Sequence, residues 1–140
     1  MSDFSIFMCG KDTTETTKFV ASKRFAKDGK PVEWEIKAID SDLDEAIRKE
    51  CTKKIPIHGK RGQYTQEIDN DKYIGKMCVA SIVYPNLNNA ELQDGYGVKT
   101  ADALLKKMLL PGEYTELKTK VMEVNGYDMS MEELVDDAKN

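Results

Sequence analysis

The chain has 140 residues, of which 40% are hydrophobic and 33% are charged. This length suits one domain that can bury a core without disulfides or metals, and the composition is not that of a disordered chain. The formal net charge of -4 argues against a protein whose main task is to hold nucleic acid or an anionic membrane, and no apolar run approaches the roughly 18 residues that a membrane helix needs.

Residues 1–10 lack the basic start and long apolar segment of a secretory signal, so we expect a cytoplasmic protein. The cysteines Cys9, Cys51 and Cys78 are far apart and form no CxxC motif, which favours free thiols over a zinc site. His58 leaves a Cys–His pair open but without support. No common catalytic or cofactor-binding motif is present. An active site assembled from scattered residues stays open, but the sequence indicates a binding protein with no enzyme activity, cofactor or metal.

Residues 1–16 run into the polar segment KDTTETT and show no periodicity. This pattern predicts a flexible N-terminal arm ahead of one domain at 17–140. Phe4, Ile6 and Phe7 are the apolar side chains of this arm, and they would let it dock on the domain or on a partner.

An antiparallel β-hairpin is predicted at about 17–39, because two alternating segments flank KDGK, and Asp28-Gly29 suits a two-residue type I′ turn. This turn sets a register that pairs Phe25 with Val32, Ala21 with Ile36, and Phe19 with Ala38. The buried face would carry Phe19, Phe25, Val32, Trp34 and Ile36.

On the other face of this hairpin the same register brings Arg24 opposite Glu33. Because an isolated hairpin is marginal in water, something must cover its apolar face. The helix predicted at 41–54 follows at once, with Ser41 as its N-cap, acidic residues at its start and lysines at its end. Its apolar stripe consists of Leu43, Ala46, Ile47 and Cys51.

Residues 54–68 are predicted to form a loop with one short strand at QYTQEI. The only basic concentration of the chain lies here, at Lys53, Lys54, Lys60 and Arg61. Phosphate binding is conceivable, but the spacing matches no phosphate-binding loop, which favours a solvated loop.

The remainder is predicted to be helical. Residues 69–84 are apolar nearly all round between Ile74 and Val83, which indicates a central buried helix that ends before Pro85. A short helix capped by Asn88 follows, with Glu91 at the reciprocal position. The next helix, at 100–110, has Leu104, Leu105, Met108 and Leu109 on its apolar side.

A further helix is marked at both ends, by Pro111 in its first turn and by Asn125-Gly126 as a left-handed stop. Its apolar stripe consists of Tyr114, Leu117, Val121 and Val124. Ser130 and Glu133 form a capping box that opens a last helix with Leu134 and Val135. The predicted fold class is therefore α+β, with an N-terminal antiparallel β-hairpin followed by a mostly helical body of five to six helices.

Several segments together resemble a known family. These are VASKRF with DGKPVEWEIKAI, the long segment from VASIVYPNLNNAELQDGYG to KVMEVNGYD, and the tail MEELVDDAKN. They are similar to the XkdN-like tail assembly chaperones of Gram-positive tailed phages and defective prophages. The resemblance covers roughly residues 4–140, and YPNLNNAELQDGYG and LLKKMLLPGEY are its most specific blocks.

The resemblance implies a protein that binds the tape measure protein, a long helical chain that sets tail length. The chaperone would keep this partner soluble until tube subunits polymerise around it, and would be absent from the mature virion. Many copies per tape measure protein, self-associating along it, are implied as well. So is a longer form made by a programmed frameshift, for which Ala138-Lys139-Asn140 could be encoded by slippery codons.

The partner-binding residues expected from this reading are Met108, Tyr114, Leu117, Val121, Met122 and Leu134. Methionine suits both surfaces that bind varied apolar partners and irregular core gaps, so core packing is the alternative for each of them. Two other functions stay open: a structural tail component retained in the virion, and a small nucleic-acid-binding regulator that uses the basic cluster near Lys60.

Overall fold

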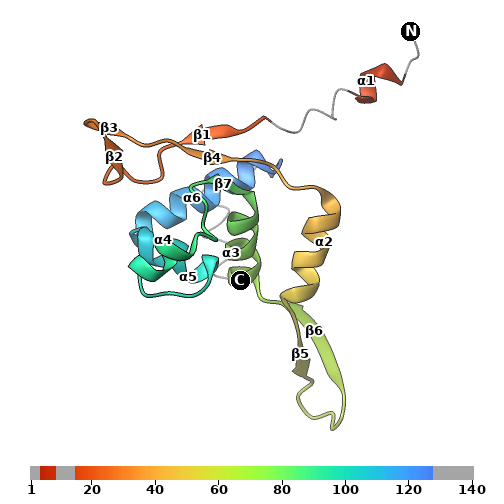
Figure 1. Cartoon of the computed structure of the whole chain (residues 1–140). Coiled ribbons are helices and arrows are strands. Elements are labelled where there is room, and N and C mark those ends of the chain that lie inside the picture. Colours follow the sequence, from red (N-terminus) through yellow and green to blue (C-terminus); the bar gives the residue numbers. More distant parts are fainter. Residues whose placement is uncertain (1–3, 9–14, 128–140) are drawn as a thin grey trace.

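The computed structural model describes residues 4–8 and 15–127 (Figure 1). The helices are α1 (Ser5–Met8), α2 (Ser41–Glu50), α3 (Asn70–Ser81), α4 (Ala90–Gly95), α5 (Ala101–Met108) and α6 (Pro111–Val124). The strands are β1 (Thr17–Phe19), β2 (Ala26–Lys27), β3 (Lys30–Pro31), β4 (Trp34–Ile36), β5 (Thr52–Pro56), β6 (Tyr64–Ile68) and β7 (Ile82–Tyr84). The predicted α+β class is confirmed, whereas the arm boundary at residue 16 stays a prediction.

The tip of the N-terminal hairpin has the predicted turn. Asp28 and Gly29 have φ values of 52° and 80°, as a type I′ turn requires. Lys27 pairs with Lys30, and the Val32 amide donates to the Phe25 carbonyl at 2.7 Å, so the predicted register holds here.

The predicted register is wrong at the base of this hairpin. Phe19 lies opposite Trp34 rather than opposite Ala38, because residues 20–25 form a loop that the facing strand lacks. The shift amounts to an even number of residues, so the same side chains still face the core. Trp34 and Ile36 are buried accordingly.

The loop at 20–25 brings Arg24 to partners far from the hairpin. Instead of facing Glu33, its guanidinium donates to the Met108 carbonyl at 2.8 Å and to Glu113 Oε1 at 2.8 Å. Glu113 Oε1 also accepts the Leu110 amide at 2.8 Å, at the start of α6. Hydrogen bonds from Ser22, Arg24 and the Leu110 backbone lower the pKa of Glu113 to about 2. The loop is thus fastened to the junction of α5 and α6.

The predicted central helix ends earlier than expected. Helix α3 stops at Ser81, and β7 then pairs with β4, giving a three-stranded sheet in the order β1-β4-β7 (Figure 1). Two features account for the change: β-branched Ile82 and Val83 favour a strand, and the residue before Pro85 disfavours helical backbone. The third strand also gives the marginal hairpin a neighbour.

Two helix starts differ by one residue from the prediction. Asp40, rather than Ser41, caps α2 by accepting the Leu43 amide, and Asn89, rather than Asn88, caps α4. Only Ile47 and Cys51 of the predicted α2 stripe are buried, whereas Leu43 and Ala46 are exposed. The reason is that α2 makes its main contacts with α3 and does not lie over the hairpin.

The core surrounds α3, which packs against α2, α5 and α6. Its largest fully buried side chains are Trp34, Ile36, Met77, Leu104, Leu105, Leu117, Val121, Cys51 and Cys78. The predicted apolar side of α5 is confirmed, as is the end of α6, where Gly126 has a φ of 92°. No helix among the described residues is long and apolar enough to cross a membrane.

Residues 52–68 form a second antiparallel hairpin, not the predicted loop. The predicted strand near Tyr64 is present as β6. Strand β5 pairs with it along its whole length, with Thr52 opposite Ile68 at one end and Pro56 opposite Tyr64 at the other. Strand β5 was not predicted, because lysines interrupt the alternation of apolar and polar residues along it. Figure 1 shows this hairpin projecting from the body beyond the end of α2.

Candidate functional site

The predicted partner-binding residues lie mainly in the core. Leu117 and Val121 are 0% exposed, and Met108 and Met122 are also buried. Tyr114 is half-buried against the core, and burial raises the pKa of its hydroxyl to about 12. Leu134 and the capping box at Ser130 lie outside the described residues. Core packing therefore occupies the described members of this set, and their contact with a partner stays a prediction.

An open groove with partly apolar walls lies between β7 and α4. Its volume is about 590 Å3, within the range of roughly 300–1000 Å3 that is usual for ligand sites. It is lined by Val83, Tyr84, Asn86, Asn89, Glu91, Leu92, Gly95 and Tyr96. Most of these residues belong to the block YPNLNNAELQDGYG, but the sequence analysis did not assign them to a binding site, because exposed apolar side chains from two short elements leave no periodic pattern.

Hydrogen bonds within one connecting segment fix the wall of this groove. Leu87 is buried, and its carbonyl accepts the side-chain amide of Gln93 at 2.8 Å. Asn89 Oδ1 accepts the Leu92 amide at 2.9 Å, which caps α4. The Asn86 side chain accepts the Asn88 amide at 3.0 Å. These bonds hold the segment between β7 and α4 in one conformation, so the groove is preformed.

The groove offers both apolar and main-chain recognition. Val83 and Tyr84 are 50% and 49% exposed, and Tyr96 lies on the facing wall. Within the part of the chain that the structure describes, β7 is an edge strand, so its outer backbone groups face away from the sheet. Exposed tyrosines beside a free strand edge suit a peptide that places apolar side chains in the groove or adds a strand.

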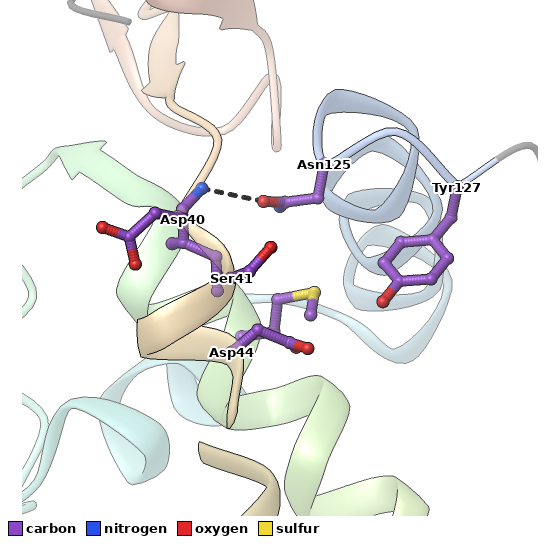
Figure 2. Close-up of a pocket in the computed structure, with 7 residues that line it drawn as sticks. Asp40, Ser41, Asp44, Asn125 and Tyr127 are labelled. Carbon is purple, nitrogen blue, oxygen red and sulfur yellow. Dashed lines mark hydrogen bonds between the residues drawn. The ribbon is translucent and has the colours of Figure 1, made fainter. Parts of the chain in front are cut away.

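A second pocket, shown in Figure 2, lies between the start of α2 and the end of α6. Its volume is about 80 Å3, far below the roughly 300 Å3 of a small-molecule site. Asn125 bridges its walls: the side-chain carbonyl accepts the Ile39 amide at 2.8 Å, and the side-chain amide donates to Ser81 Oγ at 3.0 Å. This pocket is a packing junction.

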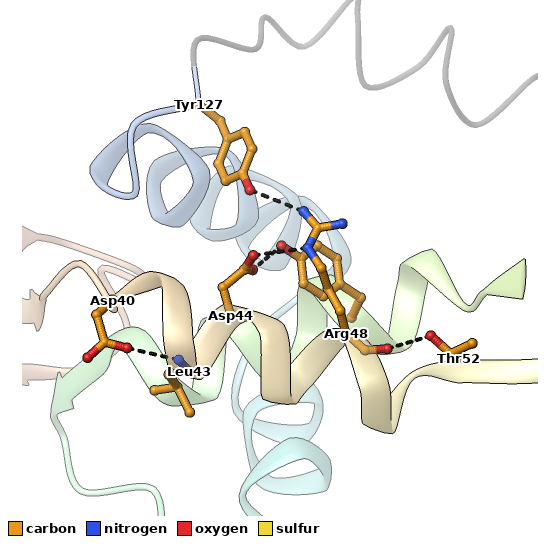
Figure 3. A network of polar contacts seen from close by, with 7 residues as sticks. Asp40, Leu43, Asp44, Arg48, Thr52 and Tyr127 are labelled. Carbon is orange, nitrogen blue, oxygen red and sulfur yellow. Dashed lines mark hydrogen bonds and ion pairs between the residues drawn. The ribbon is translucent and has the colours of Figure 1, made fainter.

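Beside this junction, a polar network joins α2, α3 and the segment after α6 (Figure 3). Arg48 donates to Asp44 at 2.9 Å and to the Tyr127 hydroxyl at 3.3 Å, and its guanidinium lies 4.6 Å from the centre of the Tyr73 ring. The Tyr73 hydroxyl donates to the other Asp44 oxygen. Burial alone would raise the pKa of Asp44, but hydrogen bonds from Tyr73 and Arg48 outweigh it and lower that pKa.

This network has the character of a structural clamp. Burial and the hydrogen bond to Asp44 raise the pKa of Tyr73, so the phenol stays protonated. Burial likewise raises the pKa of the Cys78 thiol to about 12, which makes it a poor nucleophile. Among residues 4–8 and 15–127 no group of three or more His, Cys, Asp or Glu side chains could hold a metal ion.

Comparison with known proteins agrees with the resemblance seen in the sequence. The model of the family described as phage XkdN-like tail assembly chaperone protein matches residues 4–139. Two relatives come from Bacillus subtilis strain 168. The uncharacterized protein YqbN is 33% identical over 141 residues, which cover 99% of this chain and 93% of that protein. The phage-like element PBSX protein XkdN is 32% identical over 143 residues, covering 99% and 94%.

The fold also matches a solved structure, the crystal structure of the protein YqbN. The TM-score is 0.72 at 28% sequence identity, and the match covers 91% of this chain and 99% of that one. Family, relatives and fold coincide over nearly the whole chain. This chain therefore belongs to the XkdN-like family of phage tail assembly chaperone proteins.

Proposed function

We propose that this protein binds the tape measure protein of its phage or prophage and keeps it soluble while the tail assembles. It acts before the tail is complete and is not retained in the virion. The observation that carries the proposal is the groove between β7 and α4, a preformed apolar hollow on a member of a tail assembly chaperone family. A long helical chain that lacks its tube exposes apolar surface and is prone to aggregate.

The size of the groove indicates how the protein works. A hollow of about 590 Å3 holds a few side chains, so one copy covers only a short part of a long partner. Many copies are then needed along the partner, with Tyr84 and Tyr96 as the anchors, because exposed tyrosines supply large contact area at low entropic cost. A frameshifted long form would add further contacts.

Co-expression of the chain with the tape measure protein of the same phage or prophage tests the proposal. We expect the partner to become soluble and to co-purify with the chain. Replacing Tyr84 and Tyr96 together by serine should abolish co-purification. Leu43→Ser and Leu110→Ser, made together, form the matched control, because these apolar side chains are also exposed but lie outside the groove.

The control variant distinguishes a wrong contact surface from a wrong function. Unchanged co-purification of the tyrosine variant would place the contact elsewhere on the protein, and equal loss in both double variants would show that the effect is not specific to the groove. A partner that stays insoluble with the chain and with any frameshifted long form would contradict the chaperone function. Recovery of the chain in purified tails would then identify a structural tail component.

A further inference from the structure

The β5–β6 hairpin combines three properties that together indicate a docking site. It carries four cationic side chains, and the described part of the chain provides no ion pair for any of them: Lys53, Lys54, Lys60 and Arg61. Its strands have no fully buried residue. Its tip encloses a hollow of about 450 Å3 bordered by Lys60, Arg61 and the exposed Tyr64.

These properties call for a covering partner. A two-stranded hairpin without a buried face is marginally stable in water, so a bound segment would hold it in order. That segment should be acidic to match the lysines, and amphipathic to match Ile57 and Tyr64 beside them.

The same chain contains such a segment. Residues 128–140, DMSMEELVDDAKN, carry five carboxylates against one lysine, with Met129, Met131, Leu134 and Val135 between them. The acidic and apolar residues of this segment match the basic and apolar residues of the hairpin.

The described fold places the start of this segment beside α2, the helix that leads into the hairpin. The Tyr127 hydroxyl accepts a hydrogen bond from Arg48, and the Arg48 carbonyl accepts one from Thr52, the first residue of β5, at 2.7 Å (Figure 3). Residues 128–140 span roughly 40 Å when extended and about 20 Å as a helix. The ten residues of α2 span about 15 Å, and the five-residue strands of the hairpin span about 17 Å. The extended segment is therefore long enough to pass along α2 and then along the strands.

We propose that residues 128–140 dock on the β5–β6 hairpin of the same chain, with their carboxylates over Lys53, Lys54, Lys60 and Arg61. This contact shields the basic side chains from nucleic acid. A partner that binds residues 128–140 would therefore expose the hairpin. Because the attachment at Tyr127 keeps the segment close, several weak surface ion pairs act at a high effective concentration.

Hydrogen exchange on the full chain tests the contact. The variant E132Q/E133Q/D136N/D137N removes the charges without touching the described fold. We expect β5 and β6 amides to exchange roughly tenfold faster in this variant than in the wild type, because the hairpin opens more often. The control E33Q/E91Q/D94N/E116Q neutralises four exposed carboxylates of the body and should leave the exchange unchanged. Circular dichroism checks that both variants stay folded.

Carbodiimide cross-linking of a mixture of 14N and 15N chains identifies the occupant. We expect links from Lys53, Lys54 or Lys60 to carboxylates in 132–137, and we expect both linked peptides to carry the same nitrogen isotope, because the link forms within one chain. Equal exchange in the wild type and the neutralised variant would overturn the proposal. Links found only between a 14N peptide and a 15N peptide would also overturn it, because they would identify a second copy of the chain as the occupant. Salt-dependent capture of duplex DNA by the wild type, lost in K53Q/K54Q/K60Q/R61Q, would identify nucleic acid instead and overturn it as well.

Discussion

The two hairpins of this protein have similar pairing but differ in what supports them. The N-terminal hairpin places Trp34 and Ile36 in the core and gains β7 as a third strand. The β5–β6 hairpin has longer strands, but they include no fully buried side chain. Backbone pairing alone therefore says little about the stability of a hairpin, which depends on what covers one face. The first hairpin belongs to the structural core, whereas the strands of the second have no buried side chain.

The largest expected difference between the hairpins comes from truncating one aromatic residue in each. Trp34→Ala removes a side chain that is 1% exposed, so we expect the free energy of unfolding to fall by about 3–5 kcal/mol. Tyr64→Ala, on an exposed side chain of β6, should change it by less than about 0.5 kcal/mol. Urea denaturation of both variants measures the contrast, and equal losses would mean that the second hairpin also belongs to the core.

An intermediate effect is expected where the loop of the first hairpin meets α6. Arg24→Ala removes the hydrogen bonds to Met108 and Glu113, which should cost about 1 kcal/mol of unfolding free energy. Lys27→Ala, which removes an exposed cation at the tip of the same hairpin, is the control and should cost nothing measurable. A similar loss in both variants would contradict the assignment of Arg24 as the fastening residue.

The same contact predicts a pH dependence. The pKa of Glu113 is lowered from 4.5 to about 2 in the folded protein, so its contribution to stability is present above pH 4.5. This contribution should disappear as the pH falls from about 4.5 to about 2. Glu113→Gln should show a flatter stability profile over this window in thermal unfolding. Parallel profiles for the variant and the wild type would show that Glu113 is not the titrating group.

The smallest effect is expected from shortening the second hairpin. Replacing residues 57–63 by Asn-Gly joins Pro56 to Tyr64 through a two-residue turn and keeps the register of β5 and β6. We expect the melting temperature to change by less than about 2–4 °C, since exposed loop tips tolerate such changes. A larger drop would show that the tip contributes to the core.

Local signals in the sequence predicted the features that depend on neighbouring residues. Asp28-Gly29 defined the turn of the first hairpin, and Pro111 with Gly126 defined both ends of α6. The register at Phe19 was not predictable in this way, because the loop that shifts it makes its contacts far along the chain, as between Arg24 and Glu113, 89 residues away. The strand at Ile82 was missed because a continuous apolar run is compatible with either helix or strand.

The site was harder to predict than the fold, for a physical reason. The apolar stripe from which partner-binding residues were predicted, around Leu117 and Val121, is present because the core requires it. A surface that binds a partner has fewer apolar residues, interrupted by polar ones, as at Tyr84 and Tyr96 in the groove. Periodicity therefore identifies the buried face of a helix and does not identify an exposed groove.

The distance in sequence between Arg24 and Glu113 also affects synthesis. A ribosome that adds about 5–20 residues per second reaches Glu113 roughly 5–20 seconds after it has added Arg24. During that interval Glu33 is the acidic partner that the regular hairpin register offers to Arg24. Its final partners, Glu113 and the Met108 carbonyl, arrive only with the start of α6, so we expect the loop at 20–25 to become fixed late in synthesis.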